Sequence, residues 1–458
     1  GNQTNSVTAL AQSTKPYSSV LTPIIAVGLG FGAVLLPIKI TVAMITLCIL
    51  LLLVIYTPIT LLTLLLVLSP LRTLIATEAN LSLPLDIGQM LLIVYLAGWL
   101  LYRIKHHKHM LTMMLTPSLA VITFVIAIFA FNVWSAESIT SWLTEWLKWV
   151  IIGIFVWHLT VSETHNWQWL LYAVIISAVA NAVVGLYIFF GGSGADHLLI
   201  GGRFFRAFGT FGQPNPFGGF MGIMLPIALM GLYSQLALLW QSYFKTRHLS
   251  YDVIIKVILF GMVALLLFAA LIASWSRGAW LGFIISVGIM ALAIPRRLIV
   301  SLSLSAGLAV LILGLWIGGF IPQSIINRLT TAATDFITID DIRGVDITSI
   351  NYAVVERVAH WQAAINMAEA NPIMGVGLGN YEIVYNTYRL LNWKEPLGHA
   401  HNYYLNILGE AGIIGFLVYV AFWIVIFAVT WKTRQHPDIF SRSIAIGLLG
   451  SWTYVAVH

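Results

Sequence analysis

The chain has 458 residues, of which 59% are hydrophobic and only 9% are charged, and its mean hydropathy is +0.92. A soluble domain averages about 45–50% apolar and about 25% charged residues, so this apolar excess cannot be buried inside a water-soluble core. The composition excludes a soluble enzyme, a disordered chain and a nucleic-acid-binding domain. The net charge of +6 is instead typical of a membrane protein with cytoplasmic Lys and Arg anchors. Cys48 is the one cysteine, which excludes an internal disulfide and a cysteine-based metal site.

Long apolar runs recur along the chain, and nearly all approach the length of about 20 residues that a membrane-spanning helix needs. They are continuous and do not alternate with period two, which argues against membrane strands. We therefore predict an all-α, polytopic integral membrane protein with about twelve transmembrane helices. The runs lie near residues 19–36, 38–56, 57–69, 87–103, 116–133, 141–160, 168–190, 216–240, 252–275, 277–294, 297–319, 411–432 and 442–458.

One stretch interrupts this series, because residues 321–410 contain frequent charges and no run that could span a membrane. We interpret it as one large extracytoplasmic loop domain. The predicted organisation is a transmembrane helix bundle over residues 1–320, the loop over 321–410, and C-terminal transmembrane helices over 411–458.

Within the loop, helical spacing predicts one helix from Asn351 to Asn371 and a second from Asn380 to Leu391. Asn371-Pro372 ends the first helix, because the residue before a proline avoids helical backbone angles. Three alternating glycines then predict a bend, at Gly375, Gly377 and Gly379.

The orientation follows from the Lys and Arg residues of the short loops, which favour the cytoplasmic side. With the runs as given, four cationic clusters fall on one face, which we take as cytoplasmic: Arg103, Lys105 and Lys108; Lys245 and Arg247; Arg296 and Arg297; and Lys432, Arg434 and Arg442. The stretch 191–215, the turn 275–277 and the large loop then face outward. The protein is therefore expected in the cytoplasmic membrane, with its outward loops beyond it.

Three arginines lie on the outward face against this bias, namely Arg203, Arg206 and Arg277. One interpretation is that they bind lipid headgroups or helix carbonyls. The other is that Arg206 and Arg277 clamp a diphosphate, since the guanidinium fork stays charged and forms paired hydrogen bonds with phosphate oxygens. Arg203 would lie on the same side as Arg206 if this Gly-rich piece formed a helical turn.

The large loop ends in His399-Ala400-His401-Asn402. A histidine here suits a general base, because its ordinary pKa is about 6.5; the alternative is an interfacial histidine that caps a helix. Glu410 follows nine residues after His401. It would orient the histidine, orient a neighbouring loop, or serve as a carboxylate near a helix N-terminus.

His401-Asn402, nine further residues and Gly412-Ile413-Ile414-Gly415 together resemble the signature of the bacterial O-antigen ligase family, which includes O-antigen polymerases and protein O-oligosaccharyltransferases. Arg206 with the following Phe-Gly-Gln-Pro-Asn stretch is similar to the family's first arginine motif, and Ser276-Arg277-Gly278 to its second. Arg357-Val358-Ala359-His360-Trp361 and the stretch 371–380 are similar to its loop. The resemblance covers about residues 180 to 415.

The resemblance implies a GT-C-type glycosyltransferase of a bacterial inner membrane with its active site on the periplasmic face. It would move a glycan from an undecaprenyl diphosphate lipid to an acceptor hydroxyl, such as a lipid A core, with inversion and without a nucleotide sugar or a metal. His401 would be the catalytic base, and Arg206 and Arg277 would bind the diphosphate. Secondary candidates are Arg203, Arg357, His399, Asn402 and Glu410. A polymerase with the same donor, a protein O-oligosaccharyltransferase and a transporter of lipid-linked glycans remain alternatives.

Overall fold

The structure is a computed structural model, and it describes residues 62, 65–67, 70, 87–105, 116–161, 167–192, 196–246, 250–295, 297–320, 323, 326, 342, 345, 347 and 351–458. The chain divides into two compact units. One contains Gly1–Ser69 and Ser82–Met110, and the other contains Pro70–Leu81 and Leu111–His458. The first unit is described mainly through helix α5 (Ile87–Lys105), and everything that follows concerns the second.

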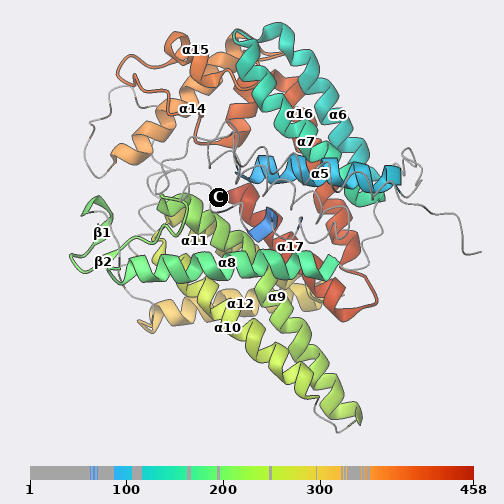
Figure 1. Cartoon of the computed structure of the whole chain (residues 1–458). Helices are drawn as coiled ribbons and strands as arrows, with labels where there is room; N and C mark the ends of the chain where they lie inside the picture. Colours follow the sequence, from blue (N-terminus) through green and yellow to red (C-terminus); the bar gives the residue numbers. More distant parts are fainter. Residues whose placement is uncertain are drawn as a thin grey trace, which may run out of the picture. The chain divides into compact units, whose positions relative to one another are not determined.

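The second unit is almost entirely helical in its described part, as Figure 1 shows. One small hairpin joins α8 and α9, in which Leu199 lies opposite Phe205 and Ile200 opposite Phe204. The elements are α6 (Pro117–Phe131), η2 (Asn132–Ser135), α7 (Ile139–Val161), α8 (Trp167–Phe189), η3 (Asp196–Leu198), β1 (Leu199–Ile200), β2 (Phe204–Phe205), α9 (Pro214–Thr246), α10 (Tyr251–Ala273), α11 (Arg277–Ala293), α12 (Leu298–Ile317), α14 (Tyr352–Ala370), α15 (Tyr381–Tyr388), α16 (Tyr403–Thr433) and α17 (Ile439–Val457).

Seven helices of the described part are long and apolar enough to cross a membrane. They confirm the prediction of an all-α, polytopic membrane protein. The number of about twelve crossings stays a prediction, because the first three apolar runs lie almost wholly outside the described residues. The seven segments are Pro117–Ser135, Ile139–Thr160, Trp167–Phe189, Pro214–Phe244, Tyr251–Ala273, Ile299–Ile317 and Tyr403–Thr433.

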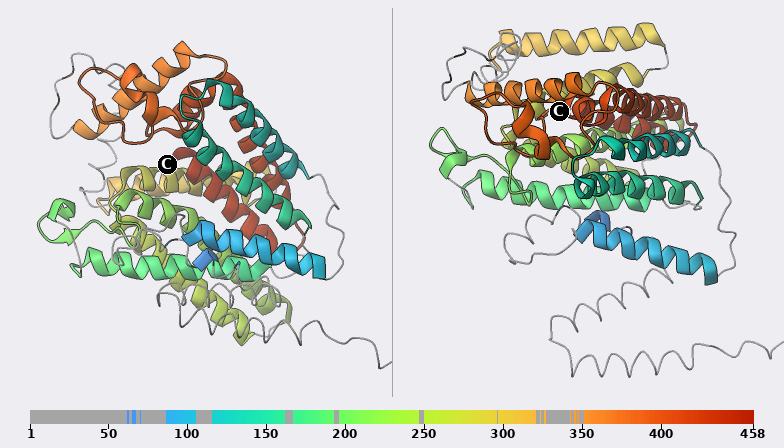
Figure 2. Two further views of the ribbon diagram at one scale, coloured as in Figure 1. Left: turned by 45° about the horizontal axis from the view of Figure 1, so that its top comes forward. Right: turned by 90° about the horizontal axis from the view of Figure 1, so that it is seen from above.

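Two helix groups make up the unit, and both views of Figure 2 show their members side by side. In the first, α6, α7 and α16 pack around Phe129, Trp149 and Tyr419. In the second, α8, α9, α10, α11 and α17 pack around a core that includes Phe217 and Tyr454. Small residues let these helices approach closely. A Cβ atom at Gly222 of α9, for example, would lie 2.1 Å from the ring of Tyr454.

The described part of the large loop contains the two helices that the sequence predicts. α14 matches the expected helix over 351–371, and α15 matches the first part of the one over 380–391. Between them, Gly375, Gly377 and Gly379 all adopt positive φ angles, of 67°, 102° and 72°. Glycine has no Cβ to oppose such angles, so the predicted bend is confirmed.

Two local expectations differ from the structure. The piece between α8 and α9 is a hairpin with Arg203 in its turn, so the helical turn that would place Arg203 beside Arg206 is wrong. Helix α16 also begins at Tyr403, so residues 403–410, which were expected in the loop, are already helical, and the helix is interrupted at Gly412, close to the predicted boundary between residues 410 and 411. Asn402 starts that helix by accepting hydrogen bonds from the N–H groups of Tyr404 (3.0 Å) and Leu405 (3.3 Å).

Candidate functional site

Helix α16 is broken at Gly412, whose backbone angles are φ 64° and ψ −169°. This conformation is nearly restricted to glycine, and it removes the ordinary hydrogen bonds of one helical turn. The glycine loop before α15 replaces them. Val376 N–H donates to Gly409 O (3.0 Å), Gly377 N–H donates to Glu410 O (2.9 Å), and Ile413 N–H donates to Pro372 O (2.9 Å). The loop and the helix break therefore form one unit.

Asn132, just after α6, fastens the same loop from the other side. Its side-chain amide donates to Met374 O and to Glu410 O (3.2 Å), and its Oδ1 accepts from Leu378 N–H. Only 2% of Asn132 is exposed, so each of these hydrogen bonds is protected from water. The sequence analysis missed this residue, because its partners lie more than 240 positions away along the chain.

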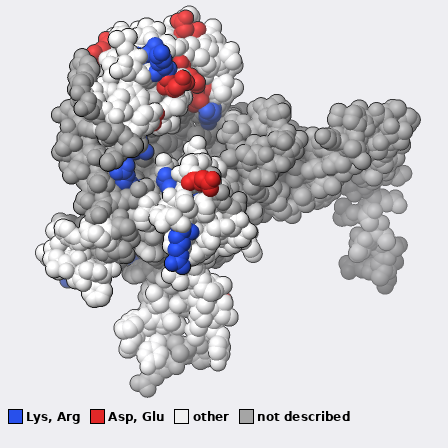
Figure 3. Space-filling model, turned by 90° about the vertical axis from the view of Figure 1, so that its left-hand side faces the viewer, with Lys and Arg blue, Asp and Glu red and all other residues white. Residues whose placement is uncertain are grey.

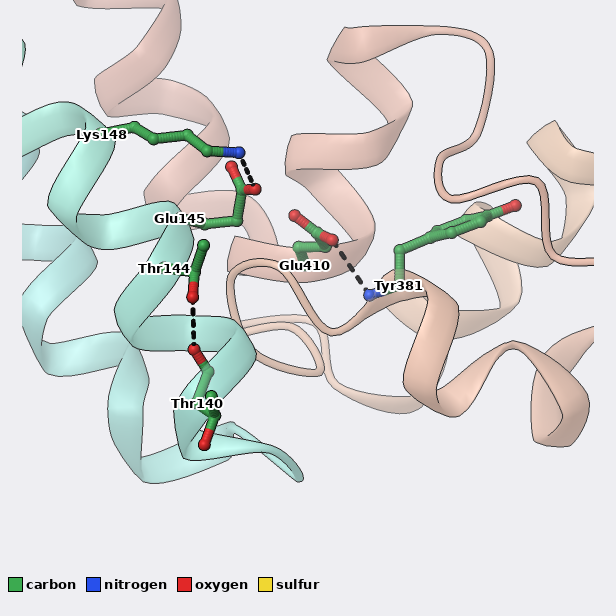
Figure 4. A network of polar contacts seen from close by, with 6 residues as sticks. All are labelled: Thr140, Thr144, Glu145, Lys148, Tyr381 and Glu410. Atoms are coloured by element: carbon green, nitrogen blue, oxygen red, sulfur yellow. Dashed lines mark hydrogen bonds and ion pairs between the residues drawn. The ribbon is translucent and has the colours of Figure 1, made fainter. Parts of the chain in front are cut away.

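Glu410 is fully buried beside the helix break, and its carboxylate accepts a hydrogen bond of 3.0 Å from Tyr381 N–H at the start of α15 (Figure 4). Of the roles considered for this residue, the contacts match the orientation of a neighbouring loop. No described hydrogen bond joins it to His401. Glu145 of α7 lies close by and pairs with Lys148 on its own helix, as Figure 4 shows. The two charges therefore pair with each other, and they do not indicate a binding site for a transported solute.

His360 of α14 is the second residue that the sequence analysis did not single out. It is only 1% exposed, its Nδ1 lies 2.8 Å from the hydroxyl of Tyr381, and its ring stacks on Tyr385 with centroids 5.0 Å apart. Its other face meets His401, with ring centroids 5.4 Å apart. A signal for this position was present, because His360 lies one helical turn before the apolar Ala363 and Ala364.

His401 lies immediately before the cap of α16, with a positive φ of 54° that is uncommon for a side-chain-bearing residue. Its ring contacts His399, with centroids 4.4 Å apart, as well as His360. It keeps an exposed edge. Partial burial, then the neighbouring charges of His399, His360 and Arg357, lower the pKa of His401 to about 4. The imidazole is therefore neutral at pH 7 and able to accept a proton.

Arg206 is held in place by backbone and side-chain acceptors. Its Nε donates to Ser274 O (3.2 Å) at the end of α10, and its Nη2 donates to Asn215 Oδ1 (3.2 Å) in α9. Arg277 is the first residue of α11, three positions after Ser274. Burial and the nearby charge of Arg277 lower the pKa of Arg206, so the two guanidinium groups are close enough to repel each other.

Arg357 connects these arginines to the histidines. Burial, and then the charge of Arg277, lower its pKa, and its own charge acts on His401. The structure thus brings Arg206, Arg277, Arg357 and His401 into one electrostatic neighbourhood, although they come from separate parts of the chain. We call these four residues the cationic site.

The remaining candidates divide into two groups. His399 and Asn402 flank His401, as their positions in the chain require. Arg203 is exposed in the hairpin turn with its guanidinium 5.0 Å from the ring centroid of Phe204, and no described interaction joins it to the cationic site. Figure 3 shows a face of the molecule on which Lys and Arg side chains lie both near the middle and at the top, with acidic side chains beside them in both places. In the described part of the chain, no three His, Cys, Asp or Glu side chains form a group that could hold a metal ion.

These features define a multi-pass membrane protein in which arginines and a neutral histidine meet at the ends of several apolar helices. Residues 262–420 match the family described as O-antigen ligase. This match supports the O-antigen ligase family, which the sequence motifs predict, and a glycosyltransferase of the O-antigen ligase or polymerase type that acts on lipid-linked glycans. The matched region includes Arg277, Arg357 and His401, while Arg206 precedes it. A comparison with curated proteins found no match.

Proposed function

We propose that the chain is an O-antigen ligase-like, GT-C-type glycosyltransferase in a bacterial inner membrane, with the cationic site at the periplasmic face. It moves a glycan from an undecaprenyl diphosphate lipid to an acceptor hydroxyl of a lipid A core or a similar glycolipid. The observation that carries the proposal is that the charge of Arg277 acts on both Arg206 and Arg357, while the charge of Arg357 acts on His401. Arginines that repel one another in this way favour a polyanionic ligand, and a diphosphate is the anion that the arginine fork fits best.

The reaction needs one proton transfer and one displacement. His401 takes the proton from the acceptor hydroxyl as that oxygen forms a bond to the anomeric carbon. The bond from this carbon to the diphosphate oxygen breaks on the opposite side, so the configuration inverts. The arginines stabilise the negative charge that the leaving diphosphate gains, which is the largest single contribution in many enzymes. General-base help supplies roughly 10²–10⁴-fold more.

The low pKa of His401 has a consequence for the order of events. A pKa of about 4 makes a neutral but weak base in the free protein. A bound diphosphate would neutralise the neighbouring arginines and so raise the pKa of His401. His401 therefore becomes a stronger base only when the donor is bound, and it is less able to take a proton when the donor is absent.

The test uses the purified full chain with an undecaprenyl diphosphate-linked glycan. Three acceptors are offered in parallel, a lipid A core glycolipid, a second lipid-linked repeat and a Ser/Thr peptide, and products are identified by mass spectrometry. Transfer to the glycolipid supports a ligase. Transfer to the lipid-linked repeat would instead identify a polymerase, and transfer to the peptide a protein O-oligosaccharyltransferase. Movement of the donor across vesicle membranes without any transfer product would instead identify a transporter. We expect no metal requirement, so activity should survive EDTA.

Variants separate the chemistry from the fold. His401→Ala should abolish transfer while the protein still inserts, and Arg206→Ala and Arg277→Ala should lower turnover strongly. Arg277→Lys should retain part of the activity, because the charge remains while the fork is lost. Lys256→Gln is the matched control, since Lys256 pairs only with Asp252 on the exposed surface of α10. Full activity of His401→Ala would refute the assignment of the base.

A further inference from the structure

A second cationic region lies at the far ends of the same helices. A cavity of about 560 Å³ is lined by Ala293 and Ile294 at the end of α11, by Arg434 and Gln435 just after α16, and by Arg442 in the first turn of α17. Two arginines thus share one cavity.

Helix geometry separates this cavity from the cationic site. α11 begins with Arg277 and ends at Ala293, and its 17 residues span about 25 Å at 1.5 Å per residue. α16 likewise starts next to His401 and ends next to Arg434. A hydrocarbon layer is about 30 Å thick, so the two regions lie at opposite surfaces of a membrane.

Arg434 is fixed in a way that leaves one donor free. Its Nη1 donates to Ala293 O (3.3 Å), and its guanidinium lies over the ring of Trp431 at 4.0 Å from the centroid. Its Nε is buried and has no hydrogen-bond partner. A buried donor without an acceptor is destabilising, and a bound anion would supply the acceptor.

No ion pair among the described residues balances these charges. Neither Arg434 nor Arg442 forms an ion pair in the described part of the chain. The nearest acidic residue along the sequence, Asp438, uses its carboxylate to cap α17 by accepting the N–H of Ser441 at 2.7 Å. Two unpaired guanidinium groups at one cavity therefore favour an external anion with several oxygen acceptors.

We propose that this cavity binds the phosphate of an anionic membrane lipid headgroup. The membrane-surface position places it where headgroup phosphates are concentrated, and basic pockets between helices at this depth suit them. Trp431 beside Arg434 is the kind of aromatic side chain that faces the headgroup layer. The proposal concerns the surface opposite the cationic site and does not depend on the glycan transfer proposed above.

The test measures lipid retention by native mass spectrometry of the full chain in detergent with added phosphatidylglycerol or phosphatidylcholine. Arg434→Gln and Arg442→Gln should each lower the ratio of phosphatidylglycerol-bound to free protein roughly tenfold, the effect of losing about 1.4 kcal/mol. Lys432→Gln is the matched control, because Lys432 is exposed on the last turn of α16 and does not line the cavity. It should leave retention unchanged.

Three results would overturn the proposal. Equal retention by the arginine variants and the control would remove the site. Equal retention of phosphatidylcholine would remove the preference for anionic headgroups. If inorganic phosphate alone raised the unfolding temperature as much as phosphatidylglycerol does, and lost this effect in the variants, the ligand would be a soluble phosphate and not a lipid. Arg442→Gln keeps the test informative if loss of the Arg434 contact to α11 impairs folding.

Discussion

The pH dependence of glycan transfer tests the electrostatics of the cationic site directly. Transfer requires the neutral form of His401, so activity is present above its pKa and is lost as the pH falls through it. A histidine with the ordinary pKa of about 6.5 would be about nine-tenths protonated at pH 5.5. With a pKa of about 4, His401 stays almost wholly neutral there. We expect kcat/KM at pH 5.5 to remain close to its value at pH 7.5, and not to fall about tenfold.

The variant His399→Asn sharpens this prediction. The charge of His399 is the second cause of the low pKa of His401, after partial burial. Its removal should move the acid limb of kcat/KM to higher pH. His197→Asn is the matched control, because His197 is exposed in η3 and does not act on His401, and it should leave the limb in place.

Donor binding should separate two pH profiles. The profile of kcat/KM reports groups of the free enzyme, and that of kcat reports the complex. Because the bound diphosphate neutralises the arginines, the acid limb of kcat should lie at higher pH than that of kcat/KM. The assay is initial-rate transfer between pH 3 and 8, with return to pH 7 to confirm that the protein stayed folded. A wild-type kcat/KM limb near pH 6.5, or no movement in His399→Asn, would refute the reasoning.

Three further outcomes follow from the structure. Gly412→Ala should destabilise the protein by more than about 2 kcal/mol, since a Cβ would lie 2.3 Å from Ile373 O. Gly288→Ala is the control, because a Cβ there would have nothing within 4 Å, and it should change stability by less than about 1 kcal/mol. Thermal unfolding in detergent compares the two variants. Tyr381→Phe should cost about 1–3 kcal/mol in the same assay, because the Nδ1 of the buried His360 loses its 2.8 Å partner, and stability equal to the wild type would contradict this. In a Cys48→Ser background, a cysteine at the exposed Leu391 should react with an impermeant reagent added outside intact cells, and labelling only after lysis would reverse the orientation.

The sequence predicts the helices well because their signal is local. Apolar runs and helical spacing identify the seven spanning segments described here, and also α14 and α15. The start of α16 was placed too late for a physical reason. Hydropathy measures apolar length, and the first two turns of α16 carry Asn406 and Glu410. The helical residues before the break at Gly412 therefore resemble the polar loop and not a membrane span.

The parts that the sequence does not reveal depend on contacts between distant segments. The hairpin around Arg203 consists of strands of only two residues each, too short for a periodic signal. Asn132 acts through partners in the glycine loop, and nothing near it in the chain indicates them. The motifs predict the grouping of Arg206, Arg277 and His401 and offer Arg357 as a secondary candidate, but the position of Arg357 depends on how α14 packs against α16.

The break in α16 explains how the imidazole of His401 is held in place. A continuous helix would bond its own carbonyls and leave the glycine loop without partners. At Gly412 those carbonyls are released, and the loop bonds them, which lets the buried Glu410 hold the start of α15 through Tyr381. Tyr381 in turn holds His360 against the ring of His401. The position of the imidazole therefore depends on a chain of buried contacts that begins at a helix break.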